Sequence, residues 1–244
     1  MTKVLVIGDS CQDVFVYCTA QRLAPDIPVP ILENKTEHTN PGMALNVKRN
    51  LSALGLLTEI ITNHDWASIT KTRFVHATTN HTFLRLDSPS VISPLAEEPN
   101  MAGFEAIVVS DYNKGFLTER MITQICRAHP LVFLDTKKIL GPWAEDAAFI
   151  KINDYEFQRS EATMTSLLRG KVIRTMGGAG AEFQGEIYPV EPVEVRDSSG
   201  AGDAFMATLV AGFLRSGDLI SSIREANTAA AQVVTKRGVT VVEP

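Results

Sequence analysis

The stretch at residues 197–205, Asp-Ser-Ser-Gly-Ala-Gly-Asp-Ala-Phe, places two glycines around one alanine directly before an acid and an apolar segment. After Gly202 two rows of large apolar residues recur at i, i+4 spacing, namely Phe205, Leu209 and Phe213, and Met206, Val210 and Leu214. These rows predict a helix with a wide buried face, which Arg215 and Gly217 would end. The free N–H groups of a helix N-terminus bind anions, and glycines allow close approach. The loop therefore has the chemistry of an oxyanion or phosphate cradle.

Asp203 follows this loop and has two interpretations. An acid in the first turn of a helix interacts favourably with the helix dipole, and this alone explains many such residues. A carboxylate beside backbone donors that hold a phosphoryl group could also accept the proton of an attacking hydroxyl. Phosphoryl transfer needs little more than in-line positioning, charge stabilisation and a base. The spacing alone leaves both interpretations open.

Three apolar runs that end in acids indicate where such a site would be assembled. The runs at residues 3–9, 105–111 and 131–135 are typical of buried parallel strands, and they end in Asp9, Asp111 and Asp135. Ligands of open α/β sheets bind beyond the carboxyl ends of the strands. The acids could line a site there, or they could simply solvate the strand ends.

The order of the remaining segments predicts an α/β fold. Helical spacing occurs at 41–55 and 118–130, with Thr118 as a candidate N-cap, and further strands are predicted at 57–62, 148–154 and 171–178. Strands that alternate with helices favour a mostly parallel sheet covered on both faces. The proline-containing segment 12–40 and the segment 70–88 favour a small flanking sheet. We expect one domain over residues 1–244.

Composition excludes several classes of function. With 244 residues, 45% hydrophobic and a formal net charge of −5, the chain has no basic face for nucleic acid. It has no apolar run of the ~20 residues that a membrane helix needs, and no signal peptide is evident, so we expect a cytoplasmic protein. Cys11, Cys18 and Cys126 lack metal-ligand spacing and are interpreted as reduced and structural. A dehydrogenase would need three glycines after the first strand, where only Gly8 occurs.

The stretch 197–205 resembles the C-terminal signature of the ribokinase-like (PfkB) carbohydrate kinases, with Ser198 and Ser199 in place of threonines. Further matches follow in the family's order at 150–157, 174–180 and 225–234. The N-terminal motifs, Gly-Asp-Ser-Cys-Gln-Asp at 8–13, Ser-Asp-Tyr-Asn-Lys-Gly at 110–115 and Leu-Asp-Thr-Lys-Lys at 134–138, are similar to those of the heptose 7-phosphate kinases of lipopolysaccharide-core synthesis. The resemblance implies a three-layer α/β/α sandwich with a small β lid.

The resemblance also implies roles for individual residues. Asp203 would be the base, and the backbone of Gly200, Ala201 and Gly202 would hold phosphoryl oxygens. ATP and Mg²⁺ would be the cofactors, with Asn153 and Glu156 acting near the phosphates and the metal through water. The nucleotide would also contact Thr175, Gly177, Gly180, Asn227 and Lys137. The sugar or sugar phosphate would contact Asp9, Asp13, Gly42, Asn46, Lys114 and Arg85, and Arg73 would lie on the lid with Arg85.

Each of these residues also has an ordinary structural interpretation. Glu156 could be a first-turn helix acid, Asn227 could satisfy a neighbouring loop, and Lys114 and Lys137 could be surface charges. A lone Gly-x-x-Gly at 177–180 is weak evidence. The resemblance further implies a monovalent cation near Asp197 and Ser199, and the lid strands are the candidate contact of a homodimer.

Two departures from the family pattern bear on function. Met43 stands where the family has the second glycine of a pair, which could narrow the sugar pocket. The chain is shortened at 57–69, 86–107 and 138–171, and we expect no nucleotidyltransferase domain after Pro244. The leading hypothesis is an ATP-dependent sugar kinase. The alternative is a trimmed, non-catalytic relative that only binds a sugar or nucleotide.

Overall fold

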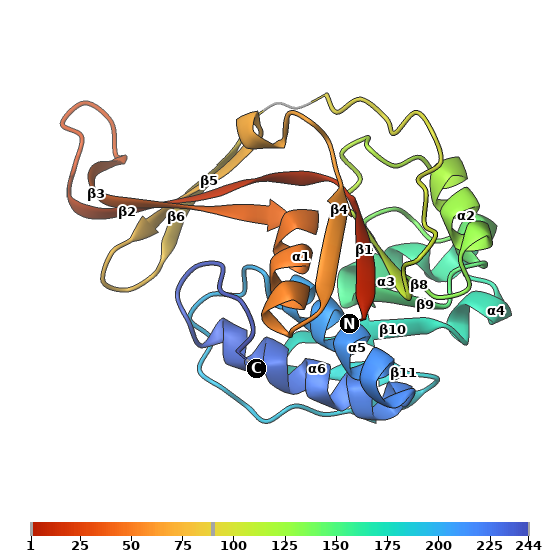
Figure 1. The fold of residues 1–244 in the computed structure, drawn as a ribbon. Coiled ribbons are helices and arrows are strands. Elements are labelled where there is room, and N and C mark those ends of the chain that lie inside the picture. The colour runs from red at the N-terminus through yellow and green to blue at the C-terminus, as the bar shows by residue number, and fades with distance from the viewer. Residues whose placement is uncertain (1, 89–90, 244) are drawn as a thin grey trace.

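The computed structural model describes residues 2–88 and 91–243 and contains two sheets (Figure 1). The larger sheet has eight strands in the order β12-β11-β10-β9-β8-β7-β1-β4. Six of them run parallel: β1 (Lys3–Gly8), β4 (Leu57–Ile61), β7 (Ala106–Asp111), β8 (Val132–Thr136), β9 (Phe149–Asn153) and β10 (Val172–Thr175). The sequence did not reveal the antiparallel edge hairpin of β11 (Ala181–Phe183) and β12 (Glu186–Tyr188), whose strands have three residues each.

Helices cover both faces of this sheet, as the alternation of segments predicts (Figure 1). Successive side chains of a strand point to opposite faces. Val4 and Val6 therefore pack with α1 (Ala44–Ala53), α5 (Ala201–Ser216) and α6 (Leu219–Val234). Leu5 and Ile7 pack in the other core cluster, with α2 (Glu119–Ala128), α3 (Asp154–Ser160) and α4 (Ser166–Arg169). The result is the expected three-layer sandwich.

The predicted ends of two helices are confirmed. The side chain of Thr118 caps α2 by accepting a hydrogen bond from the backbone N–H of Met121. Gly217 ends α5 with a φ of 69°, a left-handed conformation that glycine adopts without steric cost. On α5 the predicted apolar rows are buried as far as Val210, whereas Phe213 and Leu214 near its C-terminus are half-buried.

The smaller sheet is the predicted lid, and it extends away from the sandwich in Figure 1. Its four strands lie in the order β3-β2-β5-β6, with bounds β2 (Ser10–Leu23), β3 (Pro30–Met43), β5 (Thr70–His76) and β6 (Thr82–Asp87). Strand β2 begins two residues after β1 ends, and α1 begins directly after β3. The lid is thus joined to the sandwich at Asp9 and at Met43.

Of the three shortened segments, 57–69 and 86–107 contain little regular structure beyond the strands at their ends, whereas 138–171 contains β9, α3 and α4. Between β4 and β5 only a 3-10 turn, η1 (Trp66–Ser68), is present, and no helix or strand lies between 91 and 105. Further 3-10 turns are η2 (Pro142–Ala144), η3 (Glu161–Thr163) and η4 (Gly177–Ala179). Pro244, after which we expected no further domain, lies outside the described residues. Among the helices of residues 2–88 and 91–243, none combines the length and apolar character needed to span a bilayer.

Candidate functional site

Asp203 lies in the first turn of α5 and is almost completely buried, with 4% of its surface exposed. One carboxylate oxygen, Oδ2, accepts a hydrogen bond of 2.8 Å from Nδ2 of Asn46. The other, Oδ1, accepts one of 2.7 Å from the hydroxyl of Tyr112. Burial raises the pKa of Asp203 to about 6, although both hydrogen bonds act in the opposite direction. A carboxylate with such a pKa is suited to accept a proton near neutral pH.

Asn46 is fixed by a hydrogen-bond network inside α1. It is fully buried, and its backbone oxygen accepts a hydrogen bond from Nδ2 of Asn50. The Oδ1 atom of Asn50 in turn accepts one from the backbone N–H of Val242, near the C-terminus. The predicted sugar ligand Asn46 is therefore held in place, through Asn50, by the C-terminal segment at Val242, and it lies next to the candidate base.

Sequence reasoning missed Tyr112, although it lies in the motif at 110–115. It follows β7 directly, and ammonium nitrogens of Lys71 and Lys137 lie 4.9 and 5.3 Å from its ring centroid. The signal that could have found it is its place one residue beyond the acid that ends a buried strand. Lys71, on lid strand β5, was also missed.

The glycine loop contacts a third missed residue, Lys151. A Cβ added to Gly202 would lie 3.0 Å from Nζ of Lys151, so the ammonium group lies against the loop. Lys151 is 3% exposed and pairs at 2.6 Å with Asp135, its register partner on β8. The charged residue inside the apolar run at 148–154 was the available signal. Gly200 has a φ of 82°, which favours glycine at the N-cap of α5.

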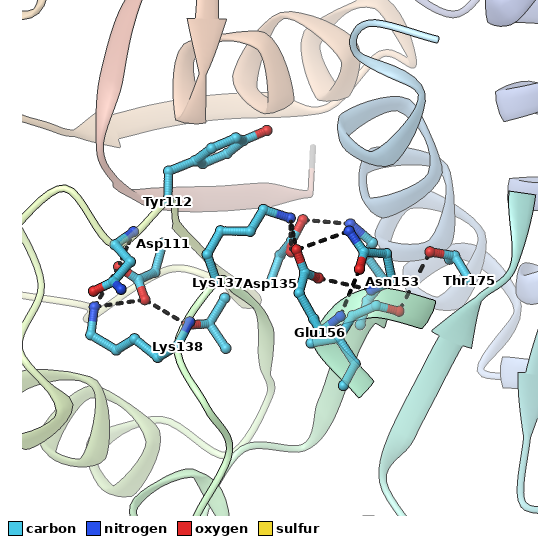
Figure 2. Close-up of polar contacts among 12 residues, drawn as sticks. Asp111, Tyr112, Asp135, Lys137, Lys138, Asn153, Glu156 and Thr175 are labelled. Carbon is cyan, nitrogen blue, oxygen red and sulfur yellow. Dashed lines mark hydrogen bonds and ion pairs between the residues drawn. The ribbon is translucent and has the colours of Figure 1, made fainter. Parts of the chain in front are cut away.

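Lys137, Glu156 and Asn153 form a polar cluster beside this pair (Figure 2). Nζ of Lys137 lies 2.6 Å from Glu156 and 3.8 Å from Asp135, and these acids raise the pKa of Lys137. Asn153 and Glu156 form a reciprocal capping box at the start of α3. The structural interpretation of Glu156 as a first-turn acid is therefore correct, and its carboxylate also faces Lys137.

A cavity of about 340 Å³ lies on the other side of the glycine loop. Its walls are largely apolar, and they include five predicted site residues together with Gly202: Thr175, Gly177, Gly180, Ala201 and Asn227. Gly180 has a φ of 91°, and a Cβ there would lie 2.1 Å from the carbonyl oxygen of Tyr188. Nδ2 of Asn227 donates to that same oxygen at 2.7 Å, so Asn227 does satisfy a neighbouring loop.

The lid contributes a second group of predicted residues. Asp13 pairs with Arg73 at 2.6 Å, and a Cβ added to Gly42 would lie 2.2 Å from Oδ2 of Asp13. Glycine at position 42 is thus what lets the Asp13 carboxylate reach the junction of the lid with α1. Cys11 lies beside them, and all three cysteines are free and buried.

Asp9 has a different environment from the one that we expected of a sugar ligand. It is fully buried, and its carboxylate accepts hydrogen bonds from the backbone N–H groups of Tyr112 and Phe116. Burial raises the pKa of Asp9, with the charge of Asp111 as a further cause. In this structure Asp9 therefore holds the loop that carries Tyr112.

Two predicted residues are not brought to the centre of the site. Arg85 lies opposite Arg73 in the lid, but its guanidinium pairs with Asp87 and is largely exposed. Lys114 is exposed on the loop after β7. The neighbouring acid Asp111, which ends that strand, pairs with Lys138 at 2.9 Å (Figure 2).

Met43 occupies a position that suits glycine. Its φ of 61° and ψ of −130° form a combination that residues with a side chain rarely adopt. The side chain is 3% exposed, and its sulfur lies 3.2 Å from Nζ of Lys71. The expected departure from the family pattern is therefore visible as backbone strain beside the candidate sugar site.

The fold is shared with solved sugar and nucleoside kinases of the ribokinase class. A nucleoside kinase from Methanocaldococcus jannaschii matches with a TM-score of 0.75 and 16% identity, over 100% of this chain and 95% of the other. A ribokinase from Thermotoga maritima matches with a TM-score of 0.74 and 14% identity, over 98% and 95%. Residues 100–244 match the model of the pfkB family carbohydrate kinases, and the chain belongs to that family.

Curated relatives match nearly the whole chain. The bifunctional protein HldE of Helicobacter pylori strain J99 is 30% identical over 98% of this chain, and that of Rhodopseudomonas palustris strain BisB5 is 29% identical over 100%. The chain spans 64% and 62% of the lengths of these relatives. The first alignment covers 296 positions, more than the length of this chain, so the relative carries segments that this chain lacks.

Proposed function

We propose that this chain is an ATP-dependent sugar kinase in which Asp203 is the catalytic base. The observation that carries the proposal is the position of one buried carboxylate. Asp203 lies in the first turn of α5, where Ala201 and Gly202 line the apolar cavity, and its carboxylate accepts hydrogen bonds from Asn46 and Tyr112. Its pKa of about 6 suits a base at neutral pH. Family membership supports the same chemistry.

In the proposed reaction the acceptor hydroxyl gives its proton to the Asp203 carboxylate. The hydroxyl oxygen forms a bond to the γ-phosphorus of ATP as the bond between that phosphorus and the bridging oxygen breaks, and ADP leaves. The backbone N–H groups at Gly200–Gly202 and the ammonium group of Lys151 stabilise the negative charge of the transferring group. The apolar cavity takes the adenine base in this proposal. A ribokinase of Arabidopsis thaliana with the same fold was solved with ribose and ATP, which supports ATP as the nucleotide.

Mg²⁺ would lie near Glu156 and Asp135. Within residues 2–88 and 91–243 no cluster of three or more metal-ligating side chains is present, so protein ligands alone do not form a cage. Oδ1 of Asp135 is buried without a hydrogen-bond partner. Nζ of Lys137 lies 3.8 Å from Asp135 and 2.6 Å from Glu156, so both carboxylates lie near the same ammonium group. Such oxygens fit an ion that keeps several waters and is held mainly by phosphates. The ion would supply neutralisation of the phosphate charge. A monovalent cation near Asp197 and Ser199 remains a prediction.

We further propose a heptose 7-phosphate as the acceptor, because the relatives HldE match nearly the whole chain. Lys71, which forms no ion pair within the described residues, supports an anionic acceptor, whereas Arg73 and Lys137 are already paired with Asp13 and Glu156. We expect action in the cytoplasm, where ATP is available.

A homodimer through the lid is supported by exposed apolar side chains on its strands and hairpin, among them Leu23, Ile27, Leu84 and Leu86.

The experiment is an ADP-release assay over a panel of free and phosphorylated sugars that includes heptose 7-phosphate. The proposal expects release with a sugar phosphate and the loss of most of this release with Asp203→Asn. Release with no sugar, in a chain that still binds ATP, would instead support the non-catalytic relative. The strained Met43 is the observation that favours this second candidate.

A further inference from the structure

We propose that Tyr112 is a positioning residue for the catalytic base, because its hydroxyl donates to Oδ1 of Asp203 and keeps the carboxylate ready to accept a proton. This inference rests on the proposed function. It assigns a role to a residue that lies outside the glycine loop and outside the nucleotide cavity.

The backbone of Tyr112 is fixed by Asp9. The fully buried carboxylate of Asp9 accepts a hydrogen bond of 2.8 Å from the N–H of Tyr112 and one of 3.2 Å from the N–H of Phe116. Asp9 follows β1 and Tyr112 follows β7, and these two strands are neighbours in the sheet. The loop that carries the phenol is thus tied to the centre of the sheet, which limits the directions in which the hydroxyl can point.

The ring of Tyr112 is also held. The ammonium groups of Lys71 and Lys137 lie 4.9 and 5.3 Å from its centroid, within the range of cation–π attraction. Lys71 comes from the lid and Lys137 from the end of β8, so the ring contacts both parts of the molecule. Burial and the charge of Asp203 raise the pKa of Tyr112 well above its usual value, which keeps the phenol protonated as a donor.

The carboxylate of Asp203 needs such donors because it is buried. Asn46 reaches Oδ2 and Tyr112 reaches Oδ1, so the two hydrogen bonds fix the plane of the carboxylate and stabilise its ionised form. The other groups that influence Asp203 come from the neighbouring strands and the lid, namely Asp135, Lys151, Lys137 and Cys11. Of the two contacting donors, only Tyr112 can be removed by deleting a single hydroxyl.

The first test compares pH profiles of kcat/KM for the wild-type protein and Tyr112→Phe, with the best acceptor from the sugar panel. We expect the acid limb of the variant to move up by about one pH unit, the shift that follows from losing one hydrogen bond to a charged group. At high pH the variant should regain wild-type activity. Tyr155→Phe is the matched control, because that ring is 66% exposed, and its profile should not move. An unshifted acid limb, or an equal loss at every pH, would overturn the proposal.

A second measurement does not depend on activity. The ¹³C signal of the Asp203 carboxyl, assigned by its absence in Asp203→Asn, is titrated in the wild-type protein and in Tyr112→Phe. The pKa of Asp203 should be higher in the variant by the same amount, and equal values would refute the coupling even if no sugar is a substrate. If the variant does not fold, 3-fluorotyrosine at position 112, a more acidic phenol and stronger donor, should move the same titration to lower pH, and an unmoved titration would refute the proposal.

Discussion

The amide of Asn46 and the carboxylate of Asp203 are 157 residues apart in the chain and meet at 2.8 Å. Asn46 lies in α1, the helix that follows the lid strand β3, and Asp203 lies in α5, the helix that follows the glycine loop. A Cβ on Gly200 would lie 2.9 Å from the same amide nitrogen. The sugar side and the phosphate side of the candidate site are therefore in direct contact, and a substitution on one side should alter the geometry of the other.

Asp203→Asn tests the base. We expect turnover to fall by about 10²–10⁴-fold, the range that general-base catalysis contributes, with ATP binding retained. The measurement is kcat by ADP release together with calorimetric ATP titration. Turnover within a few fold of the wild-type value would remove Asp203 from the mechanism.

Activity should depend on pH through the same group. Because the pKa of Asp203 is raised from 3.8 to about 6, kcat/KM should rise with pH through about 6 and then level off. A profile that stays flat from about pH 5 to about pH 7 would contradict this assignment.

The contribution of Asp203 to the free energy of unfolding should fall as pH rises, whereas its contribution to kcat/KM should increase. The folded state holds the proton of Asp203 more tightly than the unfolded state, so this group lowers the free energy of unfolding as pH rises from about 4 to about 6. The difference in pKa corresponds to at most about 3 kcal/mol. Asp203→Asn should therefore unfold at the wild-type temperature or above it at pH 8, as measured by calorimetry. A variant much less stable than the wild-type protein would show that the carboxylate holds the fold together.

Gly180→Ala should destabilise the nucleotide side of the site. The added Cβ would collide with the backbone oxygen of Tyr188, and the positive φ adds strain, so we expect a loss of at least about 2 kcal/mol in the free energy of unfolding. Gly178→Ala is the matched control, because a Cβ there has no neighbour within 4 Å. Equal denaturant midpoints for the two variants would show that the loop can adjust.

Met43 permits a direct measure of backbone strain. Alanine and glycine at position 43 both remove the buried side chain, but only glycine also relieves the positive φ. We expect Met43→Gly to be more stable than Met43→Ala by about 1–3 kcal/mol. Chemical denaturation of both variants gives this difference, and a value near zero would contradict the strain.

The buried pair of Lys151 and Asp135 should behave as a unit. Lys151→Met leaves a buried carboxylate without its closest partner, and we expect a loss of about 3–5 kcal/mol in the free energy of unfolding. Adding Asp135→Asn should restore part of this loss, since the uncompensated charge is then gone. Strictly additive losses in the double variant would show that the two residues are not coupled.

The sequence by itself determined the local features of this protein. Apolar runs and helix-end signals such as Thr118 and Gly217 are properties of neighbouring residues, and they predicted a parallel sheet covered by helices and the phosphate cradle at 200–202. The prolines of 12–40 predicted a flanking sheet, and the family resemblance implied that it is a lid. The edge hairpin of β11 and β12 was missed because strands of three residues carry too little periodicity to be recognised. The family's motif order supplied the set of candidate residues.

Only the tertiary structure decided which of these residues meet. Lys151 contacts the glycine loop because parallel pairing places it beside Asp135, and Tyr112 reaches Asp203 because Asp9, directly after the neighbouring strand β1, holds its loop. Arg85 and Lys114, equally good candidates by type, remain exposed. Contacts between distant segments depend on strand order and register, and these follow from how the whole core packs, which no short stretch of sequence contains.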